Sequence, residues 1–177
     1  MPSAAELDAM TAVQAAEQLR SCCGASRWVA AMVSRRPFET PEAVLSAAGT
    51  LWRGLSPADW EEAFRHHPRI GDQRRTAIQT ARGHAWSAVE QAGVGHADDD
   101  VRQMLTAMNE DYERRFGFVY IVNATGKSAD EMLLLARQRM TNSPEAELRI
   151  AASEHEQIMM HRLGRLLDDD RPGRSTT

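Results

Sequence analysis

One short run, Phe118 to Val122, is the only stretch of this chain whose composition is typical of a β-strand. Gly117 precedes it and Asn123-Ala124-Thr125-Gly126 follows it, so we expect a short extended connector rather than a sheet. Elsewhere β-branched residues are sparse, and Ala, Leu, Met, Glu, Gln and Arg are abundant, which favours helices. The sequence therefore predicts an all-α fold.

Proline marks where several of the expected helices begin. Thr40-Pro41-Glu42, Ser56-Pro57 and Asn142-Ser143-Pro144-Glu145 each place proline in a first helical turn. A residue that precedes proline is pushed out of the helical region, so the fourth helix should end near His66 and leave His67-Pro68 on a loop. The pattern predicts about eight helices, at residues 3–20, 24–36, 41–52, 57–66, 73–94 (with a possible break at Gly83), 98–116, 128–140 and 144–167.

We expect a single compact domain. The chain has 177 residues, 42% of them hydrophobic, and no repeat or shift of composition divides it. The domain should span residues 1–167, with a disordered tail at 168–177. No run approaches the roughly 20 apolar residues of a membrane span, and the N-terminus lacks the features of a secretory signal. The two cysteines, Cys22 and Cys23, are adjacent and poorly placed to bridge, which favours a reducing, cytoplasmic location.

Several classes of function are disfavoured. No His-Glu-x-x-His or Cys-x-x-Cys motif supplies metal ligands, so we expect no metal, and only His66, His67, His84 and Glu90 could converge on one. No glycine-rich phosphate loop supports a nucleotide cofactor. A net charge of −4, with acids and bases evenly mixed, argues against nucleic acid. The expected partner is a small molecule, with no membrane and no nucleic acid.

Two groups of polar residues could carry chemistry. His67 can donate or accept a proton near neutral pH, and the loop before Pro68 could project its ring into a cleft. It could also be a surface histidine at a turn. Ser87, Glu90 and Gln91 share one helix face because their spacings are i, i+3 and i+4. They could grip a polar heterocycle or orient a hydroxyl, or they could form a solvated face.

The last helix places two basic residues on a stripe that should be buried. Arg162 needs an anionic partner there, which could be the carboxylate of a ligand or an acid of the protein. His155 should satisfy a hydrogen bond in the core. The connector at residues 118–124 has backbone groups that also need partners, and a planar amide-like ligand or helix termini and water could supply them.

Four motifs follow one another along the chain. They are His67-Pro68-Arg69-Ile70-Gly71, Ser87-x-x-Glu90-Gln91-Ala92-Gly93, Met108-Asn109-x-x-Tyr112-x-x-x-Phe116-Gly117-Phe118 leading into Tyr120-Ile121-Val122, and Ile158-x-x-x-Arg162-Leu163. In this order they resemble the 2-oxo-4-hydroxy-4-carboxy-5-ureidoimidazoline (OHCU) decarboxylases of urate breakdown. The resemblance runs from about Trp28 to Leu167. Tyr120 stands where this family commonly has Phe, and His155 stands where it usually has an aliphatic residue.

The resemblance implies an all-α carboxy-lyase that works without a cofactor and converts OHCU to (S)-allantoin and CO2. It would make His67 the catalytic acid and Glu90 a second catalytic residue. It also implies a homodimer, with residues 128–167 as a candidate interface. The substrate contacts that it implies are Pro68, Ser87, Ala88, Val89, Glu90, Gln91, Tyr120, Ile121, Val122, Asn123, Ala124 and Arg162.

Two other classes of function are compatible with the same sequence. A helical module could bind a ureide or purine ligand in this pocket without turnover, and a third possibility is a structural helical interaction domain. The enzyme needs His67 and Glu90 to face one cavity. The binding module needs only the cavity, and the interaction domain would expose an apolar helix face.

Overall fold

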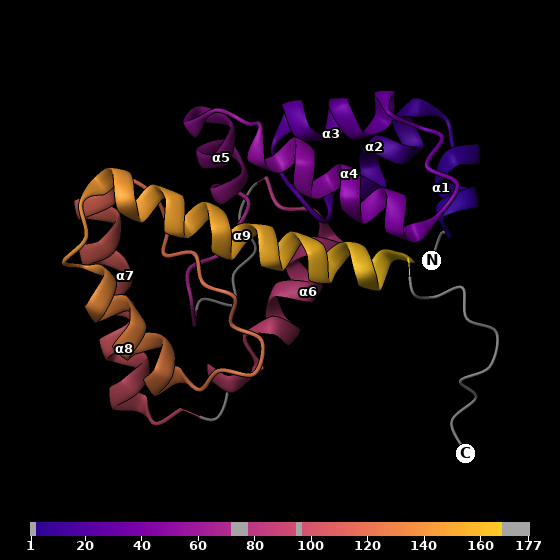
Figure 1. The fold of residues 1–177 in the computed structure, drawn as a ribbon. Helices are drawn as coiled ribbons and strands as arrows, with labels where there is room; N and C mark the ends of the chain where they lie inside the picture. Colours follow the sequence, from indigo (N-terminus) through magenta and orange to yellow (C-terminus); the bar gives the residue numbers. More distant parts are fainter. Residues whose placement is uncertain (1–2, 72–77, 95–96, 168–177) are drawn as a thin grey trace, which may run out of the picture.

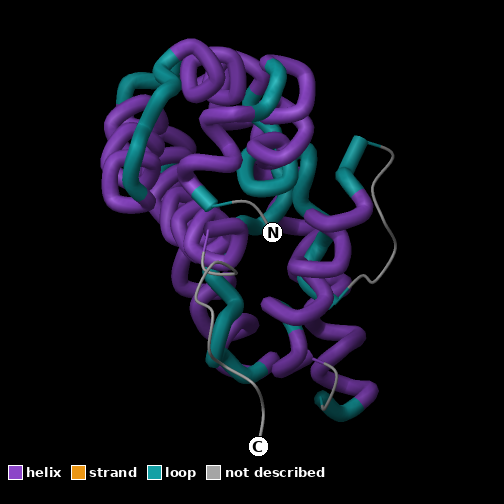
Figure 2. The backbone as a smooth tube through the Cα atoms, turned by 90° about the vertical axis from the view of Figure 1, so that its right-hand side faces the viewer, coloured by secondary structure: helices purple, strands orange, loops and turns teal. Residues whose placement is uncertain are grey.

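The computed structural model describes residues 3–71, 78–94 and 97–167. This part of the chain is all-α and holds no β-strand, which confirms the predicted fold class (Figure 2). The tail at 168–177, predicted to be disordered, lies outside the described residues. The elements are α1 (Ala4–Ala9), α2 (Ala12–Arg20), α3 (Ser26–Ser34), α4 (Pro41–Arg53), α5 (Pro57–Phe64), α6 (Ala81–Glu90), the 3-10 helix η1 (Ala92–Val94), α7 (Asp99–Phe116), α8 (Ala129–Arg139) and α9 (Pro144–Leu167).

The prediction of one helix at residues 3–20 was wrong, because two helices, α1 and α2, form this segment. Met10 is extended, with φ −66° and ψ 151°, and ends α1. Thr11 begins α2 with a reciprocal cap: its hydroxyl accepts a hydrogen bond from the Gln14 N–H, and the Gln14 side chain accepts one from the Thr11 N–H. This cap satisfies backbone donors at a new helix start, so the chain turns although the apolar pattern continues.

The helix predicted at 73–94 is shorter than expected. α6 begins at Ala81, after the Thr80 hydroxyl accepts a hydrogen bond from the Gly83 N–H at 3.0 Å. Gly83 lies in the first turn of α6 and does not break it. Residues 72–77 lie outside the described part of the chain, so the predicted start at residue 73 falls there.

The long helix α9 is the axis of the molecule (Figure 1). Helices α1 to α5 lie on one side of it, and α6, α7 and α8 lie on the other (Figure 1). Its bounds are those predicted, because Pro144 suits a first helical turn and Glu145 and Glu147 complement the positive end of the helix dipole. No helix in the described ranges is both long and apolar enough to cross a bilayer.

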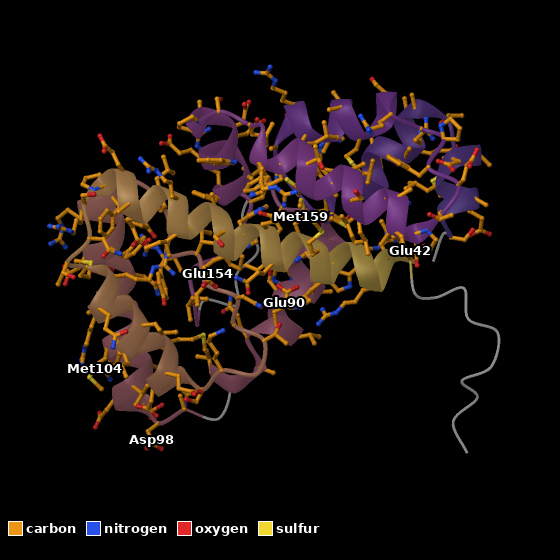
Figure 3. All side chains as sticks on the ribbon, in the orientation of Figure 1. Glu42, Glu90, Asp98, Met104, Glu154 and Met159 are labelled. Carbon is orange, nitrogen blue, oxygen red and sulfur yellow. The ribbon has the colours of Figure 1, made fainter. Side chains whose placement is uncertain are left out.

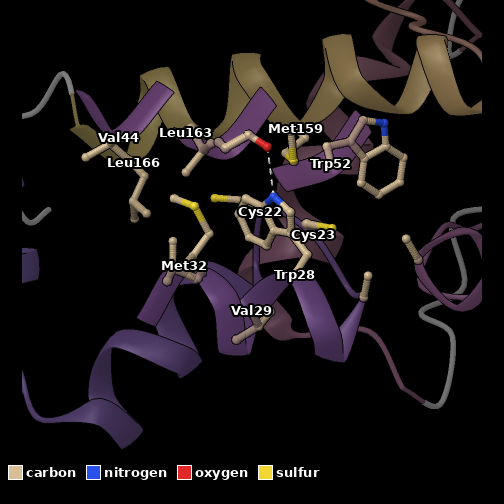
Figure 4. Packing of buried hydrophobic residues seen from close by; sticks show 14 of the residues in the cluster. Cys22, Cys23, Trp28, Val29, Met32, Val44, Trp52, Met159, Leu163 and Leu166 are labelled. Carbon is tan, nitrogen blue, oxygen red and sulfur yellow. Dashed lines mark hydrogen bonds between the residues drawn. The ribbon is translucent and has the colours of Figure 1, made fainter. Parts of the chain in front are cut away.

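Two hydrophobic clusters flank α9. The larger one joins α1–α5 to α9. Figure 4 shows Trp28 at its centre, and the Trp28 ring nitrogen donates to the Ala48 carbonyl at 3.1 Å. Cys22 and Cys23 belong to this cluster as free, buried thiols, and burial raises the pKa of Cys22 to about 12. The smaller cluster packs α7 and α8 around the connector.

The connector is extended, as predicted. Gly117 ends α7 at φ 82°, a left-handed conformation that glycine adopts without a side-chain clash. The chain then passes between the two clusters, with Ile121 packed in the larger one and Tyr120 and Val122 in the smaller one. A segment that belongs to both clusters is well placed to form the wall of a site between them.

Candidate active site

A small cavity lies where the two hydrophobic clusters meet. Four segments form it, namely the loop after α5, the last turns of α6, the connector and α9. Its lining mixes titratable, amide and apolar side chains: His67, Pro68, Ile70, Ser87, Glu90, Gln91, Tyr120, Ile121, Val122, Ala124 and Ile158. His67 and Glu90 therefore face one cavity, which is the arrangement that distinguishes an enzyme from the other two classes.

Four predicted contact residues do not line this cavity. Ala88 is exposed, and 63% of Val89 is exposed. Both face solvent because successive residues of a helix point about 100° apart, so they cannot share the inward face of Ser87 and Glu90. Asn123 and Arg162 are buried behind the lining. The geometry gives no support to a substrate contact through the side chains of Ala88 and Val89.

Two lining residues, Ile70 and Ile158, were absent from the predicted contacts. Ile158 lies one turn before Arg162 on the buried stripe of α9, so its spacing was a usable signal. Ile70 stands two residues after Pro68 on the loop, where no periodicity indicates which way a side chain points. Both add apolar surface to the cavity.

Arg162 already has an anionic partner, and that partner is Glu90. Its Nε donates to Glu90 Oε1 at 3.0 Å and its Nη2 donates to Oε2 at 2.7 Å. Figure 3 labels Glu90, which lies between α6 and α9. Both side chains are less than a tenth exposed, and Arg165 approaches the same carboxylate at 3.7 Å. Of the two anionic partners that the sequence allowed for Arg162, a ligand carboxylate or an acid of the protein, the structure shows the acid of the protein. Arg162 holds Glu90 in place.

Ser87 is fully engaged in hydrogen bonds. Its hydroxyl donates to the Gly83 carbonyl at 3.0 Å, and its oxygen accepts from Arg162 Nη2 and from Gln79 Nε2, both at 3.0 Å. A hydroxyl has only one proton to give, so Ser87 orients its neighbours and is not an activated nucleophile.

His67 lies in the turn that follows α5. Its backbone N–H donates to the Phe64 carbonyl at 3.0 Å, and Pro68 prevents the helix from continuing. The residue is buried, so the prediction that it sits at the end of a helix facing a cleft agrees with the structure. Burial, and next the positive charge of Arg162, hold the pKa of His67 well below its usual value of 6.5. This lowered pKa favours the neutral imidazole of His67 at neutral pH.

His155 does not make the core hydrogen bond that was expected of it. The side chain is fully buried on α9, and within the described residues neither ring nitrogen has a hydrogen-bond partner. Its ring stacks on Trp52 instead, with centroids 4.3 Å apart. Burial, and next the charge of Arg162, lower the pKa of His155 to about 3.

Side chains of the protein are the partners of two backbone groups of the connector, a source of partners that the sequence did not indicate. Arg139 Nη1 donates to the Ile121 carbonyl at 2.8 Å, and the Asn123 N–H donates to Glu154 Oε2 at 2.7 Å (Glu154 is labelled on α9 in Figure 3). Arg139 is itself held by a buried ion pair with Glu147, in which Nε and Oε1 are 2.7 Å apart.

The amide of Gln91 connects two walls of the cavity. Its Oε1 accepts a hydrogen bond from the Gly71 N–H at 2.9 Å, which ties the loop after His67 to the end of α6. In the described part of the chain, no three His, Cys, Asp or Glu side chains gather as metal ligands would. The chemistry on offer is therefore a neutral imidazole, a fixed carboxylate and amide groups around a partly apolar space.

Comparison with known proteins points to one family. A family model described as OHCU decarboxylase matches residues 8–164. Over 138 residues, the chain is 30% identical to the 2-oxo-4-hydroxy-4-carboxy-5-ureidoimidazoline decarboxylase of Mus musculus, covering 78% of this chain and 77% of that protein. Over 153 residues, it is 29% identical to the uric acid degradation bifunctional protein TTL of Arabidopsis thaliana, and it spans about half of that longer protein, 47%.

A solved structure has the same fold. The crystal structure of an OHCU decarboxylase in the presence of (S)-allantoin superposes with a TM-score of 0.75 at 30% sequence identity, covering 86% of this chain and 99% of that one.

Proposed function

The chain belongs to the OHCU decarboxylase family, and from that premise we propose that it removes CO2 from OHCU to give (S)-allantoin in urate breakdown. The observation that carries this proposal is the convergence of four distant sequence motifs on one cavity that His67 and Glu90 share. The similar protein solved in the presence of (S)-allantoin supports a ureide as the product bound there.

The reaction needs little from the protein besides binding and a proton. The substrate carries its carboxylate on a carbon next to a C=N bond. When the bond to CO2 breaks, its electron pair moves into that C=N system, so the step requires no cofactor. A proton must then reach one face of the product to fix its handedness. The hydroxyl on the carbon that loses CO2 becomes a carbonyl, and the new C–H bond forms on the neighbouring carbon. Overall the reaction takes up one proton, because the carboxylate leaves as CO2 and the electron pair that stays behind must be protonated.

His67 is the residue we assign to supply the proton. Burial and the positive charge of Arg162 lower its pKa, which favours the neutral imidazole before the substrate binds. An anionic substrate beside it has the opposite effect, because a negative charge favours the imidazolium. His67 thus takes up a proton as the substrate binds and donates it after CO2 has left. This order explains how a buried histidine with a lowered pKa could serve as the catalytic acid that the resemblance implies.

Glu90 and Gln91 hold the ring of the substrate. Glu90 is a carboxylate fixed by Arg162, so it accepts hydrogen bonds from the substrate hydroxyl without turning away. Gln91 and the connector groups at 120–124 match the donors and acceptors of the ureido and amide groups. Arg162 contributes by orienting Glu90 rather than by contacting the substrate carboxylate.

The test is circular dichroism of urate treated with urate oxidase and hydroxyisourate hydrolase, with and without this protein. OHCU also decays spontaneously to allantoin of no fixed hand, so rapid growth of the (S)-allantoin signal reports catalysis. We expect His67→Asn to abolish this growth while the far-ultraviolet spectrum stays helical. His161→Gln is the matched control, since it removes an exposed histidine of α9 outside the cavity.

Two outcomes would contradict the proposal. A folded and fully active His67→Asn variant would exclude His67 as the acid. A wild-type protein that leaves the spontaneous decay unchanged would remove the enzymatic function. Binding of allantoin by that inactive protein would then favour the module that holds a ureide or purine ligand without turnover.

We also infer a homodimer in the cytoplasm. Leu134 on α8 is 57% exposed and Ile150 on α9 is 37% exposed, so the 128–167 region presents apolar side chains that a second copy could cover. The two free cysteines fit a reducing compartment. Light scattering after gel filtration measures the oligomeric state, and a monomer at micromolar concentration would refute the dimer.

A further inference from the structure

His155 is a fully buried histidine beside the cavity that no step of the proposed reaction uses. In the described residues, both of its ring nitrogens lack a hydrogen-bond partner. A buried polar group without a partner costs stability, and an aliphatic side chain would fill the same space without that cost. An imidazole at this position therefore lowers the stability of the fold relative to an aliphatic side chain, which suggests that it has another role.

The ring of His155 lies between the core and His67. On one side it stacks on Trp52, with centroids 4.3 Å apart and planes inclined by 15°. On the other side it meets His67 edge to face, with centroids 5.0 Å apart and planes inclined by 77°. Trp52 is itself anchored, because its Nε1 donates to the Ala152 carbonyl at 3.0 Å. The rings of Trp52 on α4, His155 on α9 and His67 on the loop after α5 are thus packed one against the next, and His67 is the ring that lines the cavity.

Among the described residues, no hydrogen bond fixes the orientation of the His67 ring. A catalytic histidine is commonly held by a hydrogen bond from its second ring nitrogen to a carboxylate or a carbonyl. Among the described residues, no carboxylate or carbonyl makes such a bond to the ring of His67, and the nearby acid Glu90 is taken by Arg162. Within the described ranges, the ring of His67 packs edge to face against His155, and this contact can set the plane of the imidazole.

We propose that His155 is a positioning residue, which sets the orientation of the His67 ring by edge-to-face packing. The inference rests on the proposed decarboxylation. The charged and titratable groups near the pair are Arg162, which lies on the same helix as His155, and His66, which precedes His67. The positive charge of Arg162 lowers the pKa of both histidines and so favours their neutral forms. Because His155 neither lines the cavity nor donates a hydrogen bond, its effect on the reaction passes through His67.

Three substitutions at this position separate ring packing from the other roles. His155→Leu keeps an apolar side chain and removes both unpartnered nitrogens, so we expect its urea midpoint to be equal to or higher than that of the wild type. We expect its kcat to fall on the order of tenfold to a hundredfold with KM nearly unchanged, because a misplaced proton donor slows the chemical step. His155→Phe keeps a planar ring and should retain most of the kcat, whereas His155→Ala should lose as much as Leu.

The control is Met159→Leu, a buried core substitution on the same helix that should leave kcat unchanged (Met159 is labelled in Figure 4). The assay is the circular-dichroism assay of (S)-allantoin formation. A His155→Leu variant with wild-type kcat would overturn the positioning role. A folded His155→Phe variant as slow as Ala would overturn ring packing as its basis. If the wild type itself were inactive, the proposed function would fail instead, so the two failures are distinguishable.

Discussion

The carboxylate of Glu90 and the guanidinium of Arg162 form a two-pronged ion pair inside the protein, although 72 residues separate them in the sequence. The pair joins α6 to α9 directly behind the cavity. A buried pair of this kind contributes little net stability, but loss of one partner leaves a charge with no compensation. Its main effect is to fix a carboxylate that lines the cavity.

Removal of the cation should therefore destabilise the protein strongly. We expect Arg162→Met to lower the free energy of unfolding by about 3–5 kcal/mol, because Glu90 then stays buried without its main partner. The double variant Arg162→Met with Glu90→Gln should recover part of that loss, since no buried charge remains. Urea unfolding followed by circular dichroism measures both. A single variant that loses less than about 1 kcal/mol would mean that the pair behaves like an exposed one.

Buried histidines should make the stability depend on pH. In the unfolded chain a histidine titrates near 6.5, whereas the folded pKa of His155 is about 3 and that of His67 is also well below 6.5. Below pH 6.5 the unfolded state binds more protons than the folded state. The contribution of these histidines to the free energy of unfolding is therefore fully present above this pH and is lost as the solution is acidified. From about pH 6.5 to pH 5, His155 alone should account for a loss of about 1.5 kcal/mol.

The matched comparison is His155→Leu, which lacks this titration. The free energy of unfolding of the wild type should fall more steeply with acid than that of the variant, by the amount assigned to His155. If the free energies of unfolding of the two proteins changed in parallel with pH, the pKa of His155 would not be lowered in the folded state.

The hydroxyl of Tyr112 should matter for stability more than that of Tyr120. Tyr112 donates to the buried carboxylate of Glu147 and accepts from Arg139 Nη2 at 3.3 Å, so Tyr112→Phe should cost about 1.5–3 kcal/mol. Tyr120 donates to the neutral Met132 carbonyl at 3.3 Å, and Tyr120→Phe should cost about 0.5–1.5 kcal/mol. Thermal and urea unfolding of both variants test the order, and equal losses would contradict it.

Two glycines should respond to alanine in opposite directions. A Cβ on Gly93 would lie 2.2 Å from the Lys127 carbonyl oxygen, so Gly93→Ala must push η1 away from the start of α8 and should cost about 1–3 kcal/mol. Gly164 lies inside α9 with no atom within 4 Å of an added Cβ, and Gly164→Ala should gain up to about 1 kcal/mol. Differential scanning calorimetry of the two variants gives the signs, and a neutral Gly93→Ala would mean that this turn can move freely.

Most helix ends could be predicted because capping residues act locally. Pro144 marks the start of α9, and Gly117 marks the end of α7 through a conformation that few other residues adopt. The break at Thr11 was missed although its cap with Gln14 is also local, because the apolar stripe continues across it. A periodic pattern describes which face is buried, and it does not say that the helix is unbroken.

The candidate site could be predicted as a set of segments but not as a set of contacts. The sequence indicated that Arg162 needs an anion, and it could not choose Glu90, because that pairing depends on how α6 packs against α9. For the same reason it could not tell that Val89 faces solvent or that His155 has no hydrogen bond. Which face of each helix turns inward is set by contacts between elements, and a local pattern does not contain them.

In the part of the chain that the structure describes, α9 takes part in two buried ion pairs, through Glu147 near its start and Arg162 near its end. About 22 Å of continuous helix separates these two positions. A single residue inserted between Glu147 and His155 would rotate everything beyond it by about 100° and turn Arg162 and His155 away from Glu90 and His67. We therefore expect α9 to tolerate substitutions on its exposed face far better than an insertion or a deletion between these positions.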